Sequence, residues 1–259
     1  MHISQLTYLD AIIVIKPLDF SRKSVLVVGG SSGIGNAIAQ AFRRQGAMVH
    51  AWGRRAGRLS DGAEDDSDLE GLEYHRVDVT DPSAVEAAQP GFAALDVLVL
   101  SQGTVLYGRQ EYDMSGFRSV LEVNLISLMA ISLKFREALA ANGGSLIIVT
   151  STAAFHATIG NPGYNASKAG AAGLTRTLAA AWAPSGIRVN GIAPGLVDTK
   201  LTRITTADPE RLDAFRRKIP VGRLGLAQEM AGVALFLASP LASYVVGQTI
   251  VVDGGLTLQ

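Results

Sequence analysis

Ser24-Val25-Leu26-Val27-Val28-Gly29-Gly30-Ser31-Ser32-Gly33-Ile34-Gly35 is the stretch that decides the fold of this chain. Its β-branched first half predicts a strand over 24–28, and the apolar spacing from Ala37 to Ala47 predicts a helix after the glycines. Glycines between a strand and a helix let the backbone turn sharply and approach a pyrophosphate at the helix N-terminus. A glycine cluster alone indicates only a tight turn, but this context favours nucleotide binding by Gly29, Ser31, Ser32, Gly33, Ile34 and Gly35.

Strand and helix patterns alternate along the rest of the chain. The predicted strands lie at 47–52, 73–77, 96–100, 146–149, 186–192 and 249–255, and the predicted helices at 113–141, 162–181 and 230–237, with another beginning at Pro82. No repeat or composition break marks a second domain, so the pattern predicts one doubly wound, Rossmann-type α/β domain. We expect residues 1–19 to be an extension without assignable chemistry and residues 20–259 to form a single dinucleotide-binding catalytic domain.

Composition excludes several classes of function. Lys plus Arg and Asp plus Glu both number 23 in the 259 residues, so no net charge attracts nucleic acid or an anionic membrane. The absence of cysteine excludes disulfides and thiol chemistry. The four histidines show no metal-ligand spacing, so no metal is expected, and no apolar run approaches the ~20 residues of a membrane-spanning helix. These features predict a cytoplasmic protein that recognises a small molecule locally.

The second predicted strand ends in Gly53-Arg54-Arg55, and these residues bear on the choice between NAD and NADP. An acidic side chain here would bind the ribose 2′-hydroxyl of NAD, but Arg54 and Arg55 instead offer guanidinium groups suited to the 2′-phosphate of NADP. The alternative is two solvated surface arginines, and NAD remains possible because Gly53 carries no negative charge. Asp78, followed by Val79, either reaches an adenine amino group or ends the third strand. Residues 56–72 are acidic and predict a loop or short exposed helix without function.

Tyr164 and Lys168 are four residues apart in the predicted helix over 162–181, so they lie one turn apart on one face. A phenol with a pKa of about 10 is a poor proton donor or acceptor at neutral pH. A neighbouring ammonium would lower that pKa by roughly 1–3 units, and the Ser151 hydroxyl could hold a substrate oxygen beside the phenol. Such a pair is common on surface helices, and its meaning depends on the rest of the chain.

Two further stretches place polar residues near this pair. Asn124 interrupts an apolar helical face, where asparagine is disfavoured, and it serves either a backbone or water hydrogen bond or a proton relay. Ser101-Gln102-Gly103 and Pro194-Gly195-Leu196-Val197-Asp198-Thr199 follow strands at the carboxyl edge of the sheet, where ligands bind in open α/β folds. Residues 196–220 predict a substrate lid, whose basic residues are either its solvated face or an anion site.

Taken together, these residues resemble the classical short-chain dehydrogenase/reductases from about Phe20 to Leu258. The glycine loop matches the cofactor loop of that family, Asn124, Ser151, Tyr164 and Lys168 match its catalytic tetrad, and Pro194-Gly195 with Thr199 matches its nicotinamide-side motif. The resemblance implies Tyr164 as general acid/base, Ser151 holding the substrate oxygen, Lys168 binding the nicotinamide ribose and lowering the phenol pKa, and Asn124 holding a relay water. It also implies a seven-stranded parallel sheet and a homotetramer or homodimer, with long helices packed across one interface.

Three departures from the family pattern stand out. Val28 replaces a common threonine, Leu100-Ser101-Gln102-Gly103 keeps only the glycine of the usual Asn-Asn-Ala-Gly, and the stretch from Asp81 to Asp96 is short enough to predict a trimmed helix. None of them alters the tetrad.

The resulting prediction is an NADP(H)-preferring oxidoreductase that interconverts a ketone and a secondary alcohol. The alternatives are a 3-oxoacyl-thioester reductase of the same fold and a non-catalytic NADP(H)-binding sensor. Further cofactor contacts are expected from Gly103, Tyr164, Lys168, Pro194, Gly195, Val197 and Thr199. Substrate contacts are expected from Gln102, Thr104, His156, Leu196 and Leu201, although His156 has the alternative of packing in a loop.

Overall fold

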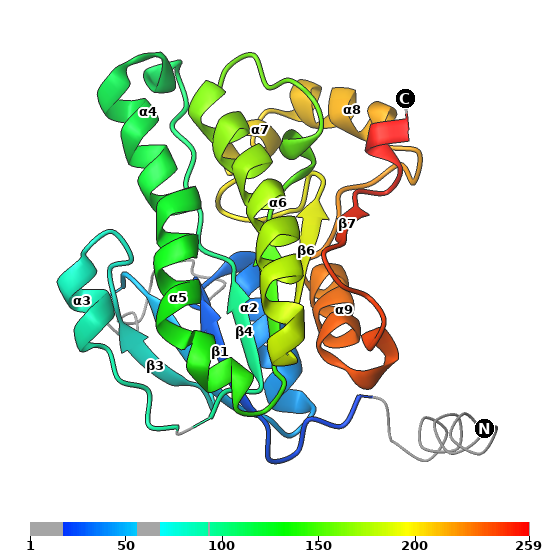
Figure 1. The fold of residues 1–259 in the computed structure, drawn as a ribbon. Coiled ribbons are helices and arrows are strands. Elements are labelled where there is room, and N and C mark those ends of the chain that lie inside the picture. Colours follow the sequence, from blue (N-terminus) through cyan, green and yellow to red (C-terminus); the bar gives the residue numbers. More distant parts are fainter. Residues whose placement is uncertain (1–17, 56–67, 93, 259) are drawn as a thin grey trace.

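The computed structural model describes residues 18–55, 68–92 and 94–258, so most of the expected extension at 1–19 and of the loop at 56–72 lies outside it. Seven parallel strands form one sheet in the order β3-β2-β1-β4-β5-β6-β7 (Figure 1). This confirms the predicted seven-stranded parallel sheet. The strands are β1 Ser24–Val28, β2 Met48–Gly53, β3 Glu73–Arg76, β4 Val97–Leu100, β5 Ser145–Val149, β6 Arg188–Pro194 and β7 Thr249–Val252.

Helices cover both faces of the sheet (Figure 1). They are α2 Gly33–Arg44, α3 Pro82–Ala87, α4 Met114–Leu121, α5 Ser127–Ala140, α6 Pro162–Trp182, α7 Arg203–Thr206, α8 Pro209–Lys218 and α9 Ala227–Ala238. Short 3-10 turns at Gln110–Tyr112, Thr152–Ala154, Ala183–Ser185, Pro240–Ala242 and Leu256–Leu258 join some of these elements. The expected trimmed helix is the six-residue α3, which begins where the Asp81 carboxylate accepts hydrogen bonds from the backbone N–H groups of Ser83 and Ala84.

The two faces of β1 show how the sheet separates two cores. Val25 and Val27 belong to one buried cluster with Ile38 of α2 and Ala234 of α9. Leu26 and Val28 belong to the other, with residues of α5 and α6. Since successive strand residues point to opposite faces, an uninterrupted apolar run fills both cores.

The helix predicted over 113–141 is not a uniform α-helix. A π-helical segment, Glu122–Ile126, separates α4 from α5, and Asn124 lies within it. An extra residue per turn shifts the side chains that follow, and such segments are frequent at functional sites. The start of the sixth strand also differs from its prediction, because Gly186 has φ +79° and closes the turn that follows Pro184, so β6 begins at Arg188.

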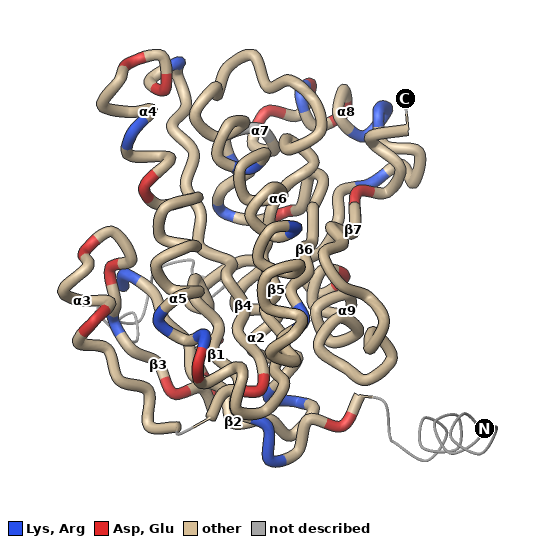
Figure 2. Tube along the Cα trace, viewed as in Figure 1, with Lys and Arg blue, Asp and Glu red and all other residues tan. Residues whose placement is uncertain are grey.

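Among the described residues, the continuous helical stretch Met114–Ala140 is long and apolar enough to cross a membrane by length and composition alone. The expectation that no stretch reaches this length is therefore wrong by that measure. However, 44% of its most apolar window is buried, and Leu128, Ile131 and Phe135 pack into the core. Figure 2 shows acidic and basic residues on α4 and α5 as well as on other elements. We attribute the apolar character of this stretch to its position against the sheet.

Candidate active site

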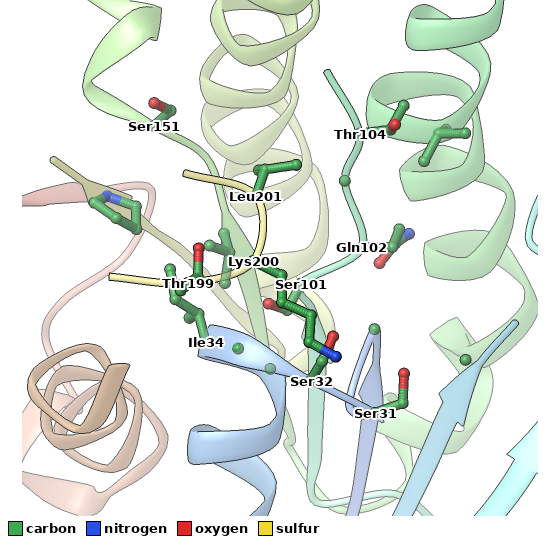
Figure 3. A pocket seen from close by; sticks show the side chains of 18 of the residues that line it. Ser31, Ser32, Ile34, Ser101, Gln102, Thr104, Ser151, Thr199, Lys200 and Leu201 are labelled. Atoms are coloured by element: carbon green, nitrogen blue, oxygen red, sulfur yellow. The ribbon is translucent and has the colours of Figure 1, made fainter. Parts of the chain in front are cut away.

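A cavity of about 620 Å³ lies at the carboxyl ends of the parallel strands, where β1 and β4 lead to helices on opposite sides. Figure 3 shows side chains from separate loops around it, including Ser31 and Ser32, Thr104, Ser151 and Leu201. The cavity lining includes most of the predicted site residues: Gly29, Ser31, Ser32, Gly33, Ile34, Gly35, Arg54, Arg55, Val79, Gln102, Gly103, Thr104, Ser151, Tyr164, Lys168, Pro194, Gly195, Val197, Thr199 and Leu201.

The glycine loop forms one wall of the cavity because side chains would not fit there. Gly29 has φ +79°, and a Cβ at this position would lie 2.6 Å from the Gln102 backbone nitrogen. Gly33 has φ +53° and opens α2. Its N-cap residue Ser32 makes no side-chain capping hydrogen bond, so the first N–H groups of α2 are left for another acceptor. This cradle fits a pyrophosphate.

Arg54 and Arg55 form the basic end of the cavity. They follow β2 directly, and their backbone carbonyls accept hydrogen bonds from Arg76 Nε and the Tyr74 hydroxyl, which holds the strand ends together. Asp78 does not line the cavity. Its Oδ1 accepts hydrogen bonds from the backbone N–H (3.0 Å) and hydroxyl (2.8 Å) of Thr80, and these bonds lower its pKa. Asp78 thus follows the end of β3 at Arg76 and holds the turn there, and its contact with adenine stays a prediction.

Tyr164, Ser151 and Lys168 meet at the other end of the cavity. Tyr164 and Lys168 lie one turn apart on α6, and the Lys168 Nζ is 5.6 Å from the centre of the phenol ring. The buried ammonium donates to the Val149 carbonyl at 3.1 Å, at the end of β5. A Cβ on Gly103 would lie 3.6 Å from this Nζ, so the β4 loop closes over the lysine. Burial lowers the pKa of Lys168 to about 8.

The prediction that the pKa of the Tyr164 phenol is lowered is wrong. Burial raises the pKa of Tyr164, and the neighbouring Tyr107 and Glu111 raise it further. The hydrogen bond with Ser151 is the interaction that lowers it. Lys168 is not among the groups that shift the pKa of Tyr164: its amine donates to the Val149 carbonyl and lies 5.6 Å from the centre of the phenol ring.

Asn124 is buried in the π-helical segment and uses its whole amide on protein groups. Its Oδ1 accepts from the Thr104 backbone N–H at 2.7 Å, and its Nδ2 donates to the Thr104 carbonyl at 2.8 Å and to Ser167 Oγ at 3.1 Å. Ser167 in turn donates to the Tyr164 carbonyl at 2.7 Å. Of the alternatives for Asn124, backbone hydrogen bonding is therefore observed. The side chain fixes the β4 loop against the first turns of α6.

Glu111 is a site residue that the sequence analysis missed. It is buried, and its carboxylate accepts from three donors: the backbone N–H groups of Leu106 (2.9 Å) and Tyr164 (2.7 Å) and the Asn161 amide (3.3 Å). It thus joins the loop after β4 to the N-terminus of α6, where a negative charge is favourable. No local sequence pattern predicts this role for Glu111. Leu106 lies 5 positions before it, but Asn161 and Tyr164 lie 50 and 53 positions after it.

The substrate side of the cavity is formed by two loops. The Tyr107 hydroxyl donates to the Leu201 carbonyl at 2.6 Å, which connects the loop after β4 to the segment after β6. Gln102 is buried, and its Nε2 donates to Ser127 Oγ at 3.0 Å, whereas its Oε1 has no hydrogen-bond partner within the described part of the chain. Lining residues that the sequence analysis did not assign are Trp52, Gly53, Val77, Ser101, Val123, Val149, Thr150, Lys200 and Thr202.

Two predicted substrate contacts lie elsewhere. His156 is exposed, with Nδ1 3.1 Å from the Ala157 carbonyl, and Asn165 donates to its backbone carbonyl at 2.8 Å. It therefore belongs to the loop before α6, as its alternative interpretation held. Leu196 is absent from the cavity lining, and its backbone carbonyl accepts a hydrogen bond from the Gly225 N–H at 3.0 Å.

The fold and cavity define a dinucleotide-binding α/β protein. Comparison with known proteins gives the family: the family model described as enoyl-(acyl carrier protein) reductase matches residues 28–257. The chain belongs to the classical short-chain dehydrogenase/reductases and is an NAD(P)-dependent oxidoreductase.

Several relatives are similar to this chain over nearly their full length. A 3-oxoacyl-(acyl-carrier-protein) reductase FabG from Chlamydia pneumoniae is 38% identical over 246 residues, which cover 91% of this chain and 97% of that protein. A cis-4-hydroxycyclohexanecarboxylate dehydrogenase from Sinomonas cyclohexanicum is 37% identical over 251 residues, covering 92% and 98%. A crystal structure with bound NADP from Agrobacterium tumefaciens, provisionally a 2-deoxy-D-gluconate 3-dehydrogenase, has a TM-score of 0.84 and 34% identity, covering 95% of this chain and 100% of that one.

Proposed function

We propose that this protein is an NADP(H)-preferring oxidoreductase that interconverts a ketone and a secondary alcohol, with Tyr164 as the general acid/base. The observation that carries the proposal is the meeting of Tyr164, Ser151 and Lys168 at one end of a cavity whose other end is a glycine cradle flanked by two arginines. Tyr164, Ser151 and Lys168 can exchange a proton with a substrate, and the glycine loop with its two arginines fits a phosphorylated dinucleotide.

The cofactor would be held along the length of the cavity. The α2 N-terminus and the loop from Gly29 to Gly35 fit its pyrophosphate, and Arg54 and Arg55 suit a 2′-phosphate. When bound, the nicotinamide supplies hydride transfer. The NADP in the Agrobacterium structure agrees with this preference, although NAD(H) remains a second cofactor to test.

The roles of the reacting residues follow from their surroundings. The burial that raises the pKa of Tyr164 keeps its phenol protonated, so it can donate its proton to the oxygen of a ketone during reduction. Ser151, which already interacts with the phenol, would hold the same oxygen. Lys168 would bind the nicotinamide ribose and stabilise the phenolate that remains after proton transfer.

A 3-oxoacyl-thioester is the second candidate substrate, because the FabG relative is a reductase of that class. The hydroxycyclohexanecarboxylate dehydrogenase, however, is similar to almost the same degree. Gln102, Thr104 and Leu201 would contact either substrate.

We further propose that residues 20–259 act as one catalytic domain, with 196–220 as a lid that carries α7 and α8. Ile126, Met129 and Leu133 are exposed along one stripe of the π-helical segment and α5, which supports a homodimer or homotetramer that buries this stripe. A cytoplasmic location is consistent with these roles.

The test is a panel of ketones, 3-oxoacyl thioesters and secondary alcohols, each assayed with NADPH or NADP and with NADH or NAD at the nicotinamide absorbance. Reduction of a simple ketone with a lower KM for NADPH supports the proposal. Turnover confined to acyl thioesters would select the second candidate. Tight NADPH binding without turnover of any member would favour the sensor.

A further inference from the structure

His50, Glu73 and His75 form a cluster of potential metal ligands for which the proposed reaction has no use. The spacing of the histidines along the chain does not indicate it. In the sheet, however, His50 pairs with Glu73 and Trp52 pairs with His75. Paired residues of parallel strands, and residues two apart in one strand, point to the same face, so all three side chains project together from β2 and the outermost strand β3 (Figure 1).

The ligand atoms are close to the spacing that a metal ion requires. Glu73 Oε2 is 3.5 Å from His50 Nδ1, and Glu73 Oε1 is 3.2 Å from His75 Nε2. One ligand atom of each residue lies within 4.8 Å of the other two. With zinc–ligand bonds of 2.0–2.2 Å, neighbouring ligands in a tetrahedral site lie about 3.3–3.6 Å apart. Small side-chain rotations would therefore close the site.

The buried imidazole of His50 supports a metal site independently of the distances between the three side chains. Its side chain is buried, with 1% of the residue exposed, and neither ring nitrogen has a hydrogen-bond partner among the described residues. At 3.5 Å the Glu73 carboxylate is near Nδ1 without forming that bond. The ring packs edge-on against Phe92 at 5.0 Å and parallel to His75 at 6.0 Å. Buried polar atoms are almost always satisfied, so this imidazole requires a partner.

We propose that His50, Glu73 and His75 bind one Zn²⁺ ion, which fixes the edge strand β3 to β2. Two imidazole nitrogens and a carboxylate oxygen suit zinc better than Mg²⁺ or Ca²⁺, which prefer oxygen ligands. The side chains of Glu73 and His75 are 54% and 39% exposed, which leaves access for the ion and a water ligand. This site is independent of the proposed reaction.

The experiment is titration of untagged, metal-free protein with Zn²⁺ by calorimetry, and with Co²⁺ by absorption spectroscopy. The chain has no cysteine and only two other histidines, His2 and His156, which makes the assignment direct. The test variants are His75→Ala and Glu73→Gln, both at partly exposed positions. A variant with alanine at both His2 and His156 is the matched control.

The expected result is one ion per chain in the wild type and in the control, with a Zn²⁺-dependent rise in Tm. Affinity should fall roughly 100-fold or more in His75→Ala, because even groups that only support a ligand contribute 10–100-fold. Equal Tm values of wild type and His75→Ala without metal would show that the variant is folded. No stoichiometric binding by the wild type, unchanged affinity in His75→Ala, or loss of binding in the control would each overturn the proposal.

Discussion

The two sides of the cavity are built differently. On the catalytic side, α6 buries Ser167 and Lys168, and Glu111 and Asn124 are each hydrogen-bonded to three neighbouring backbone or side-chain groups. On the substrate side, α8 has no buried residue, and the Tyr107–Leu201 hydrogen bond connects the two loops there. A rigid set of reacting groups thus faces a surface that tolerates change. Such a difference is consistent with the unlike substrates in the names of relatives of nearly equal similarity.

If this contrast is correct, substitutions on the catalytic side reduce kcat and those on the substrate side change KM. Tyr164→Phe provides the largest expected effect. It removes the proton donor and keeps the ring, so kcat should fall ~100- to 10,000-fold while the Kd for NADPH stays within about twofold. Steady-state kinetics and NADPH fluorescence titration measure the two quantities. Retained turnover would remove Tyr164 from the acid/base role.

Lys168→Met tests whether the buried ammonium is kept for function at a cost in stability. Activity should fall roughly 100-fold. Since the pKa of Lys168 is lowered from 10.5 to about 8, the unfolded chain binds more protons than the folded one between these values, and the penalty is fully present below pH 8. The variant should therefore be more stable at pH 7, by on the order of 2–3 kcal/mol, and the gain should shrink as pH rises from 8 towards 10. Urea unfolding at several pH values measures this, and a less stable variant at pH 7 would contradict it.

Replacing both Arg54 and Arg55 with alanine tests the cofactor end. Loss of charge-assisted hydrogen bonds to a 2′-phosphate should weaken NADPH binding ~10- to 100-fold and leave NADH binding unchanged. Titration with both cofactors measures the ratio, and Arg136→Ala on α5 is a control of the same charge type away from the cavity. Parallel losses for both cofactors would mean that the arginines only support the fold.

Glu111→Gln tests the carboxylate that connects the β4 loop to α6. An amide offers one acceptor oxygen to three donors, so kcat should fall about tenfold and stability by about 1–3 kcal/mol. Because Glu111 raises the pKa of Tyr164, the rise of alcohol oxidation with pH should begin at lower pH in the variant. Glu137→Gln, exposed on α5, is the control. A stability loss without a shifted pH profile would limit Glu111 to a structural role.

Tyr107→Phe gives the smallest expected effect and probes the substrate side. The variant loses the hydroxyl bond to the Leu201 carbonyl, so KM for the substrate should rise roughly threefold with little change in kcat. Tyr112→Phe is a matched control, because its hydroxyl donates to the Ile159 carbonyl at 2.7 Å outside the cavity lining. If kcat falls in Tyr107→Phe instead, the contrast between the two sides fails.

Local sequence patterns were sufficient for the architecture. Six of the seven strands were identified from apolar runs and the third from the short stretch at 73–77, and the glycine loop and the Tyr164–Lys168 spacing indicated which loops form the cavity. The π-helical segment could not be predicted, because it depends on the bonds from Asn124 to Thr104 and Ser167, which the tertiary fold brings together. Glu111 and the His50–Glu73–His75 cluster were missed for the same reason.

The pKa of Tyr164 shows a second limit of prediction from the sequence. The four-residue spacing correctly placed an amine beside the phenol, but the direction of the pKa shift depends on burial and on the nearby Tyr107 and Glu111. Neither can be read from residue spacing. Likewise, His156 is only five residues beyond Ser151, yet the bond from Asn165 to its backbone carbonyl holds it in an exposed loop.

The most direct test of the proposed reaction is a single turnover of a ketone with NADPH deuterated on the transferred position of nicotinamide C4, followed by mass spectrometry of the alcohol. If hydride passes directly to the substrate, the deuterium appears on the carbinol carbon in the wild-type reaction, and product formation is nearly lost in Tyr164→Phe. Unlabelled alcohol from the wild type, or labelled alcohol formed equally fast by Tyr164→Phe, would contradict the account.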